Sequence, residues 1–260
     1  MTMIEECAAF IAARRLAGRD IADLPAGLKP ASQDDGYAVQ AAVTRRLLAA
    51  GRGPLVGWKL GVTTRRMQEL INMDGPGAGA MLADGRHDSP ATVSAATFTR
   101  LGIECEIAFV MGARLTGPVS RQEAAAAVSH IHPAIELVDN RYGDFRSFGA
   151  PGMIADAMFH AGFVLGPAVA AWRDIDLAAV TGTTVVNGAP LLQGRGAEVL
   201  GHPLESVRVL AAVLGRQGLA LEPGQVVMAG SLPLPHWARE GEHIEARLEG
   251  LGSAMVTVNA

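Results

Sequence analysis

The chain has 260 residues, of which 49% are hydrophobic and 18% are charged, and its formal net charge is −4. A chain of this length and composition buries a large core, which excludes disorder as its main state. With 22 basic against 26 acidic residues, it offers no basic stripe to neutralise a run of phosphates, so we expect no nucleic-acid partner.

The cysteines and the N-terminus predict a soluble cytoplasmic protein. Cys7 and Cys105 are the two cysteines, and they supply neither a disulfide framework nor a zinc site. Glu5 and Glu6 stand where a signal peptide needs basic residues, and no apolar stretch approaches the ~20 residues of a membrane span. We therefore expect no membrane partner.

The N-terminal part is predicted to be helical and the remainder to be rich in strands. Apolar positions at helical spacing fill residues 3–16 and 33–50, the second with Ser32 as a candidate N-cap. We accordingly expect a helical N-terminal region at 1–54 and a catalytic core at 55–260, which together form one structural unit. Short apolar runs bounded by glycine predict strands at 55–62, 103–111, 134–138 and 163–165.

Two further helices and two pairs of strands complete the predicted elements. Ser120 and Glu123 have the spacing of a capping box, and a second helix is expected from about residue 204 to 216. Asn187-Gly188 predicts a hairpin turn, and residues 243–258 predict two paired strands. The predicted fold class is α+β, with the helical region packed on a larger mixed β core.

Motifs of several common enzyme classes do not occur in the sequence. The glycine-rich run 74–79 lacks the Gly-Lys-Ser/Thr ending of a nucleotide site, so we expect a mobile loop or lid there. The histidines show no metalloprotease spacing, and no Gly-x-Ser-x-Gly motif indicates a serine hydrolase.

A pair of glutamates on one strand is a candidate metal site. Glu104 and Glu106 share a strand face about 6.6 Å apart, and Ala108 and Val110 continue that face. A solvated outer face is one interpretation, but the apolar neighbours indicate a covered face, where like charges need a proton or a cation. Glu136 offers a third carboxylate on another apolar run. Three carboxylates would leave about three of the six positions around Mg2+ for substrate and water.

Lys59 stands between two glycines on one face of a predicted strand. The neighbours Gly57 and Gly61 carry no side chain, so a ligand could lie against the backbone there. An ordinary solvated lysine is the alternative. Beside a metal, a desolvated lysine could bind a carboxylate or move a proton.

At these residues the chain resembles the hydratase and decarboxylase branch of the fumarylacetoacetate hydrolase superfamily, which contains 2-oxopent-4-enoate hydratases and 4-oxalocrotonate decarboxylases. The resemblance extends from about residue 56 to 235. It rests on the order and spacing of GWKLGVT (57–63), ECEIAF (104–109), PAIELVD (133–139), VLGHP (199–203), and LEPGQVV (221–227) followed by GSL (230–232).

The resemblance implies a mixed β-roll core with a helical N-terminal region, assembled as a homo-oligomer. It also implies Mg2+ or Mn2+ held by Glu104, Glu106 and Glu136, where the metal chelates the carboxylate and 2-oxo oxygens of an α-keto acid. The lysine that matches Lys59 is the catalytic residue that assists in stabilising the enolate. We add Ser231 and His160 as candidate substrate-binding residues.

The predicted function is a metal-dependent lyase that hydrates a 2-hydroxy-2,4-dienoate or its 2-oxo-4-enoate tautomer in the catabolism of aromatic or related compounds. The alternatives are a 2-oxo acid decarboxylase of the 4-oxalocrotonate type, a hydrolase of acylpyruvates, and a non-catalytic metal-binding relative. A decarboxylase of this type has to accommodate a second carboxylate, for which Arg141 is a candidate.

The chain departs from the hydratase pattern in two places. Gly77 stands where hydratases usually carry a second aspartate, and Ala157, Met158 and Phe159 replace a stretch with an asparagine and a serine. Polar capacity is therefore lost at the far end of the pocket. We expect a preference for an alkyl or aryl tail over a second carboxylate, with His160 as a candidate substitute proton carrier.

Overall fold

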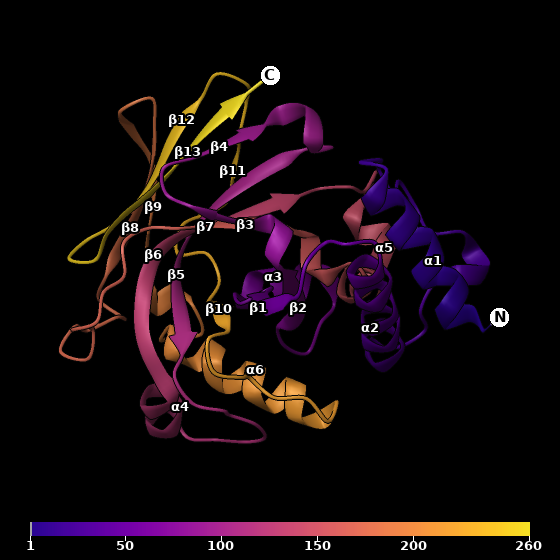
Figure 1. The fold of residues 1–260 in the computed structure, drawn as a ribbon, viewed down its shortest axis with the longest axis horizontal. Coiled ribbons are helices and arrows are strands. Elements are labelled where there is room, and N and C mark those ends of the chain that lie inside the picture. The colour runs from indigo at the N-terminus through magenta and orange to yellow at the C-terminus, as the bar shows by residue number, and fades with distance from the viewer. Residues whose placement is uncertain (1) are drawn as a thin grey trace.

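The computed structural model describes residues 2–260, apart from the side chains at 66 and 145–147. Within these residues the strands form two sheets (Figure 1). The larger sheet has the order β2-β1-β10-β5-β6-β7-β3, with β11 also paired to β5. Its strands are β1 (Leu55–Gly61), β2 (Gly77–Leu82), β3 (Arg86–Asp88), β5 (Leu101–Met111), β6 (Val128–Asp139), β7 (His160–Leu165), β10 (Val226–Met228) and β11 (His236–Trp237).

The smaller sheet covers one face of the larger one. Its order is β4-β13-β12-β8-β9, and the predicted hairpin at Asn187-Gly188 joins β8 to β9 with positive φ at both residues. Ile103 and Phe109, on one face of β5, belong to the core that also holds Ile244 and Val256 of this sheet. The glutamate face of β5 therefore points the other way. The strands are β4 (Ala91–Ser94), β8 (Thr181–Val186), β9 (Ala189–Arg195), β12 (His243–Leu248) and β13 (Gly252–Asn259).

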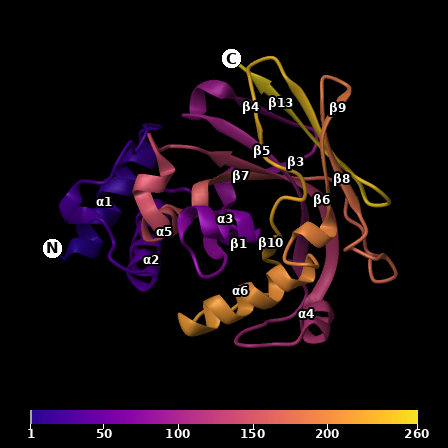
Figure 2. The same cartoon turned by 180° about the vertical axis from the view of Figure 1, so that it is seen from behind.

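Helices cover the remaining sides of the sheets, and they confirm the predicted α+β class. The N-terminal helices α1 and α2 pack with α5 into a layer with its own apolar core, at the side of the molecule away from the smaller sheet (Figures 1 and 2). Both predicted caps, at Ser32 and Ser120, are complete capping boxes. None of the helices within residues 2–260 has the length and apolar character to cross a membrane. The helices are α1 (Met3–Leu16), α2 (Gln33–Ala49), α3 (Arg65–Ile71), α4 (Arg121–Ala127), α5 (Phe145–Ala155) and α6 (Leu204–Arg216).

The structure corrects the expectation of a mobile loop at 74–79. Residues Gly77–Leu82 form β2, which is buried and pairs antiparallel with β1. A Cβ atom at Gly77 would lie 2.8 Å from the sulfur of Met158, and one at Gly79 would lie 2.5 Å from the carbonyl oxygen of Ala157. The glycines are therefore needed for close packing rather than for mobility, which the sequence pattern does not distinguish.

Helix α2 covers the outer edge of the larger sheet with two side chains. The backbone amide of Ala78 donates to the Tyr37 hydroxyl at 3.1 Å, and that of Ala80 donates to the Gln40 side-chain oxygen at 3.2 Å. Gln40 Nε2 in turn donates to the carbonyl groups of Ala78 and Ile154. These bonds replace a neighbouring strand along β2 and tie the helical layer to the sheet.

Replacing Gln40 by leucine is expected to lower the free energy of unfolding by about 2 kcal/mol, because it leaves three buried backbone groups without partners. Urea unfolding measures the loss. Gln33→Leu, at the exposed start of the same helix, is the matched control. A loss no larger than that of the control would contradict this account of the sheet edge.

Candidate active site

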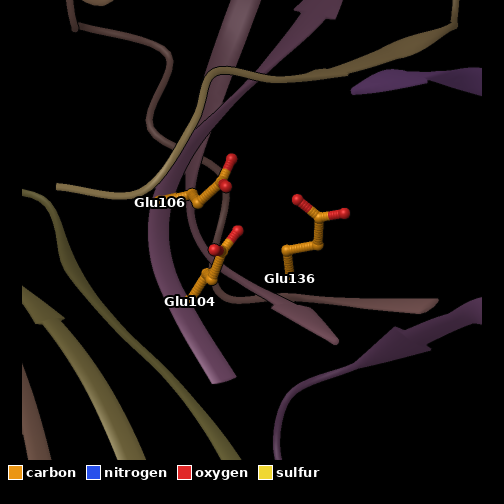
Figure 3. Close-up of side chains that lie close together, drawn as sticks. All are labelled: Glu104, Glu106 and Glu136. Atoms are coloured by element: carbon orange, nitrogen blue, oxygen red, sulfur yellow. The ribbon is translucent and has the colours of Figure 1, made fainter. Parts of the chain in front are cut away.

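Three carboxylates meet on the glutamate face of the larger sheet. The antiparallel register of β5 and β6 sets Glu104 opposite Glu136, with Glu106 two residues further along the same face. One carboxylate oxygen of each residue lies within 4.8 Å of the others (Figure 3). Glu106 and Glu136 are buried, and Glu104 is partly exposed to the cavity beside it. We refer to these three residues as the carboxylate cluster.

Lys59 reaches the carboxylate cluster from β1. Its Nζ lies 3.2 Å from Glu136 Oε1 and donates to the Met158 carbonyl oxygen at 3.0 Å. The side chain is buried, so it is not an ordinary solvated lysine. Burial alone would lower the pKa of Lys59, but the cluster, above all Glu136, raises it, and the side chain is an ammonium at neutral pH.

Burial and mutual repulsion act strongly on the acids themselves. Burial and the neighbouring Glu136 raise the pKa of Glu104 to about 7, and burial with the same neighbour holds the pKa of Glu106 well above its usual range. At Glu136, burial is outweighed by Lys59 and His160, which lower its pKa. Without a cation, the cluster therefore holds protons at neutral pH.

Two oxygens of the cluster lack a partner. Glu106 Oε1 and Glu136 Oε2 are buried and accept no hydrogen bond from the part of the chain that the structure describes. Carboxylate oxygens are the ligands that Mg2+ and Mn2+ prefer. Oxygens bound to one Mg2+ at about 2.1 Å lie at most about 4.2 Å apart, so small shifts of these side chains suffice to bind one ion. The donor set therefore fits a hard divalent metal.

The chain between β10 and β11 fixes the other oxygen of Glu106. The backbone amide of Gly230 donates to Glu106 Oε2 at 2.8 Å. Gly230 has a φ of 112°, and a Cβ atom there would lie 2.7 Å from Thr63 Cγ2. Both facts require glycine at this position, which lies in the GSL motif.

His160 lies behind the carboxylate cluster. Its Nδ1 is 2.9 Å from Glu136 Oε1, and it does not line the cavity in front of the cluster. Burial lowers the pKa of the ring, so it is neutral at pH 7. Because Glu136 is ionised, Nδ1 carries the proton and donates, while Nε2 has no partner among the described residues.

Arg141 belongs to a buried ionic network and does not line the cavity. Its Nε donates to Asp156 at 2.9 Å, and its Nη2 donates to the His160 carbonyl at 3.1 Å. Asp156 also accepts from the Tyr142 hydroxyl at 2.6 Å and pairs with Arg15 of α1 at 3.6 Å. Our candidate for binding a second carboxylate is thus committed to a buried acid, and the network connects the N-terminal helix to His160.

The segment that follows α5 has an unusual backbone. Ala157, Met158 and Phe159 all have positive φ, between 54° and 67°, which costs a non-glycine residue on the order of 1 to 2 kcal/mol each. The turn presents the Met158 carbonyl to Lys59 Nζ. The strained backbone of this turn therefore helps to hold Lys59 beside the carboxylate cluster.

A cavity of about 350 Å³ opens in front of Lys59 and Glu104. Its wall is largely apolar, as expected from the departures at 157–159. Ser231 lines it, with its hydroxyl donating to the Pro233 carbonyl at 2.7 Å. The apolar lining includes Val62, Met67, Met153, Met158, Phe159 and Trp237. The polar lining includes Lys59, Thr63, Arg100, Glu104, Asn140 and Ser231.

The sequence analysis missed Arg100 and Asn140 as cavity residues. Neither lies in a motif of the resemblance, because Arg100 precedes the glutamate run and Asn140 follows the strand that carries Glu136. Both residues lie at the same end of the β5–β6 pair, next to the paired residues Leu101 and Asp139. They could have been found only if the register of the two strands had been known.

Known proteins with similar sequences fall into one family. Residues 78–259 match the profile of the fumarylacetoacetate (FAA) hydrolase C-terminal family. A 2-keto-4-pentenoate hydratase of Paraburkholderia xenovorans (strain LB400) is 31% identical over 250 residues, covering 96% of this chain and 92% of that protein. A 4-oxalocrotonate decarboxylase of a Pseudomonas species is 32% identical over 227 residues, covering 85% and 87%.

A solved structure shares the fold over nearly the whole chain. It is that of 4-oxalocrotonate decarboxylase from Pseudomonas putida G7 in complex with magnesium and adipate. It has a TM-score of 0.93 and 28% sequence identity, covering 99% of this chain and 98% of that one. The resemblance found in the motifs is therefore confirmed by sequence and by fold. The chain belongs to the fumarylacetoacetate hydrolase family, in the branch of the hydratases and decarboxylases.

Proposed function

We propose that the protein is a divalent-metal-dependent lyase that adds water to a 2-hydroxy-2,4-dienoate or its 2-oxo-4-enoate tautomer. The observation that carries the proposal is the carboxylate cluster with two unpartnered oxygens, next to a lysine ammonium and a largely apolar cavity. Relatives that align over 96% of the chain are hydratases of such acids. By analogy with these relatives, we place the activity in the catabolism of aromatic compounds.

Glu104, Glu106 and Glu136 would hold the ion, Mg2+ or Mn2+. When bound, it supplies a Lewis acid for the carboxylate and 2-oxo oxygens of the substrate, where charge develops on enolisation. Other groups of the chain hold two of these carboxylates in place. Glu106 is held by the Gly230 amide, and Glu136 is held by both Lys59 and His160.

Lys59 is the residue to which we assign electrostatic stabilisation of the enolate. Its ammonium is fixed by the Met158 carbonyl and Glu136 at the inner end of the cavity. A fixed positive charge in a site with little water stabilises developing negative charge more than it stabilises the neutral substrate. His160 orients Glu136 through the Nδ1 hydrogen bond, so we assign it a positioning role.

Decarboxylation of a 2-oxo diacid is the second candidate. The enolate that hydration requires is also the product of losing carbon dioxide next to the conjugated system, so the same cluster and lysine would serve. Arg100 in the cavity lining favours this candidate, because it offers a cation for a second carboxylate. The 4-oxalocrotonate decarboxylase relative supports it as well.

The product distinguishes the two reactions. We expect the purified protein with Mg2+ to consume the conjugated absorbance of a 2-hydroxydienoate and to yield a product that has gained one water by mass. Loss of carbon dioxide from an oxalocrotonate-like diacid, without hydration of any dienoate, would contradict the hydratase assignment and favour the second candidate. No turnover of either substrate would contradict both.

Replacing Glu106 by glutamine is expected to weaken Mg2+ binding by at least ~100-fold, the effect of removing one charge from a buried ionic cluster. Titration calorimetry measures the affinity, and Glu240→Gln, at an exposed position, is the matched control. Equal Mg2+ binding by the Glu106→Gln variant and the parent would show that the cluster is not the metal site.

The same titration on the parent protein tests the protonation of the cluster. Mg2+ has to displace the proton that Glu104 holds below its pKa of about 7. The affinity should therefore fall by at least about 10-fold from pH 8 to pH 6, because Glu104 alone contributes one displaced proton and the pKa of Glu106 is raised as well. An affinity that is flat over this range would contradict the raised pKa.

Replacing Lys59 by methionine is expected to lower kcat by at least ~100-fold, because it removes the cation at the enolate end. Lys29, the only other lysine of the chain, is exposed and paired with Asp23, so Lys29→Met is the control. Mg2+ binding should persist in the Lys59→Met variant. Unchanged kcat would remove Lys59 from the catalytic machinery.

A further inference from the structure

One guanidinium in the cavity lining lacks an acidic partner. Arg100 makes no ion pair with any residue that the structure describes, and its guanidinium carbon lies 4.4 Å from the centre of the Trp237 ring. The other cation of the lining, Lys59, is balanced by the carboxylate cluster. Arg100, which is exposed to solvent, is thus the one cation of the lining without an acidic partner among the described residues.

Arg100 and Asn140 stand side by side at one end of the β5–β6 pair. The backbone amide of Arg100 donates to Asp139 Oδ1 at 2.8 Å, and the amide of Asn140 donates to the Arg100 carbonyl at 3.0 Å. The Asn140 side-chain oxygen accepts from the Tyr142 amide. Its side-chain NH2 is therefore a donor with no partner among the described residues, in the lining of the same cavity.

The cavity has one end at Glu104 of the carboxylate cluster and another at Arg100. The length of chain between these two residues separates the ends. Arg100 precedes Glu104 by four residues, which span about 13 Å of extended chain. A substrate whose 2-oxo acid end lies at the carboxylate cluster must therefore extend several carbon atoms before it reaches Arg100. The apolar wall between the two ends suits a conjugated carbon chain.

Trp237 supports the Arg100 guanidinium at the solvent-exposed mouth of the cavity. The tryptophan lies on β11, in register with Gly102 of β5. A Cβ atom at Gly102 would lie 3.0 Å from a carbon of the Trp237 ring and 2.6 Å from Val138 Cγ2. The absence of a side chain at Gly102 lets the indole pack here, where its face carries the Arg100 guanidinium.

We propose that Arg100 and Asn140 form a subsite for a second carboxylate, so that the substrate is a dicarboxylic 2-hydroxydienoate or 2-oxo-enoate. The inference rests on the proposed function, because it takes the carboxylate cluster as the site of the 2-oxo acid end. A guanidinium and an amide NH2 are the donors that recognise a carboxylate. This proposal differs from the expectation of an uncharged tail, which rests on the replacements at Gly77 and at 157–159.

Two probes that differ only at the far end test the subsite. 2-Oxoadipate and 2-oxohexanoate share the 2-oxo acid and the chain length, and they end in a carboxylate and a methyl group. Titration calorimetry of the Mg2+-loaded protein is expected to give at least about 10-fold tighter binding of 2-oxoadipate, the effect of one hydrogen bond to a charged group. Because neither probe is turned over as a dienoate, the measurement does not depend on which reaction the enzyme performs.

Arg100→Gln is expected to abolish the preference for 2-oxoadipate and to leave the binding of 2-oxohexanoate unchanged. The matched control is Arg14→Gln, because Arg14 also stacks on an aromatic ring, Phe10, but lies on α1 outside the cavity. Trp237→Leu should reduce the preference for 2-oxoadipate in part, because it removes the ring on which the Arg100 guanidinium stacks but keeps the positive charge of Arg100. The preference should also shrink at high salt.

The outcomes separate this inference from the proposed function. Equal affinity of the two probes for the parent protein would overturn the subsite and leave the proposed function standing. An equal loss of affinity for both probes in the Arg100→Gln variant would also overturn the subsite, because it would indicate that Arg100 has a structural role. Failure of both probes to bind the Mg2+-loaded protein would overturn the proposed function, and the subsite with it.

Discussion

The structure depends on one electrostatic constraint, which is the gathering of three carboxylates, two of them buried, beside a single buried lysine that pairs with Glu136. With all three acids ionised and His160 neutral, the cluster of Glu104, Glu106, Glu136 and Lys59 has a formal charge of −2, and two of its oxygens have no partner. Buried like charges are stable only when a proton or a cation compensates them. A divalent ion removes the excess charge and partners both free oxygens at once. Protons at Glu104 and Glu106 would also remove the charge, but they would not bring the three carboxylates onto one centre.

The fold around the cluster holds each acid by a different element. The β5–β6 register faces Glu104 and Glu136 toward each other, the β10–β11 segment supplies the Gly230 amide, and β1 supplies Lys59. The helical layer contributes indirectly, because Arg15 and Arg141 donate to the carbonyl of His160, whose ring holds Glu136. The closely packed glycines of β1 and β2 and the strained turn at 157–159 bring Lys59 into this arrangement. Stability and site geometry are therefore supplied by the same contacts.

The sequence predicted those features that depend on local pattern. Helix periodicity and capping residues located α1, α2, α4 and α6, and the alternation of β5 placed Glu104 and Glu106 on one face, away from Ile103 and Phe109. It did not predict the helices α3 and α5. The errors at the site depend on contacts between distant segments. The glycines at 77 and 79 were mistaken for a lid because the packing partner, the turn at 157–159, is not visible in their own pattern. Arg141 was proposed for a carboxylate because its buried partner Asp156 lies on another element, and Arg100 was missed because its place in the cavity follows from the strand register.

The most direct test of the central claim is a crystal structure of the protein with Mn2+, in which anomalous scattering locates the ion. The account predicts one strong peak between Glu104, Glu106 and Glu136, with an oxygen of each at about 2.1 to 2.2 Å, and with Lys59 retained beside Glu136. Glu106 Oε1 and Glu136 Oε2, which have no partner among the described residues, are expected among the ligands. An ion bound elsewhere in the chain, or a cluster that stays free of metal at saturating Mn2+, would contradict it.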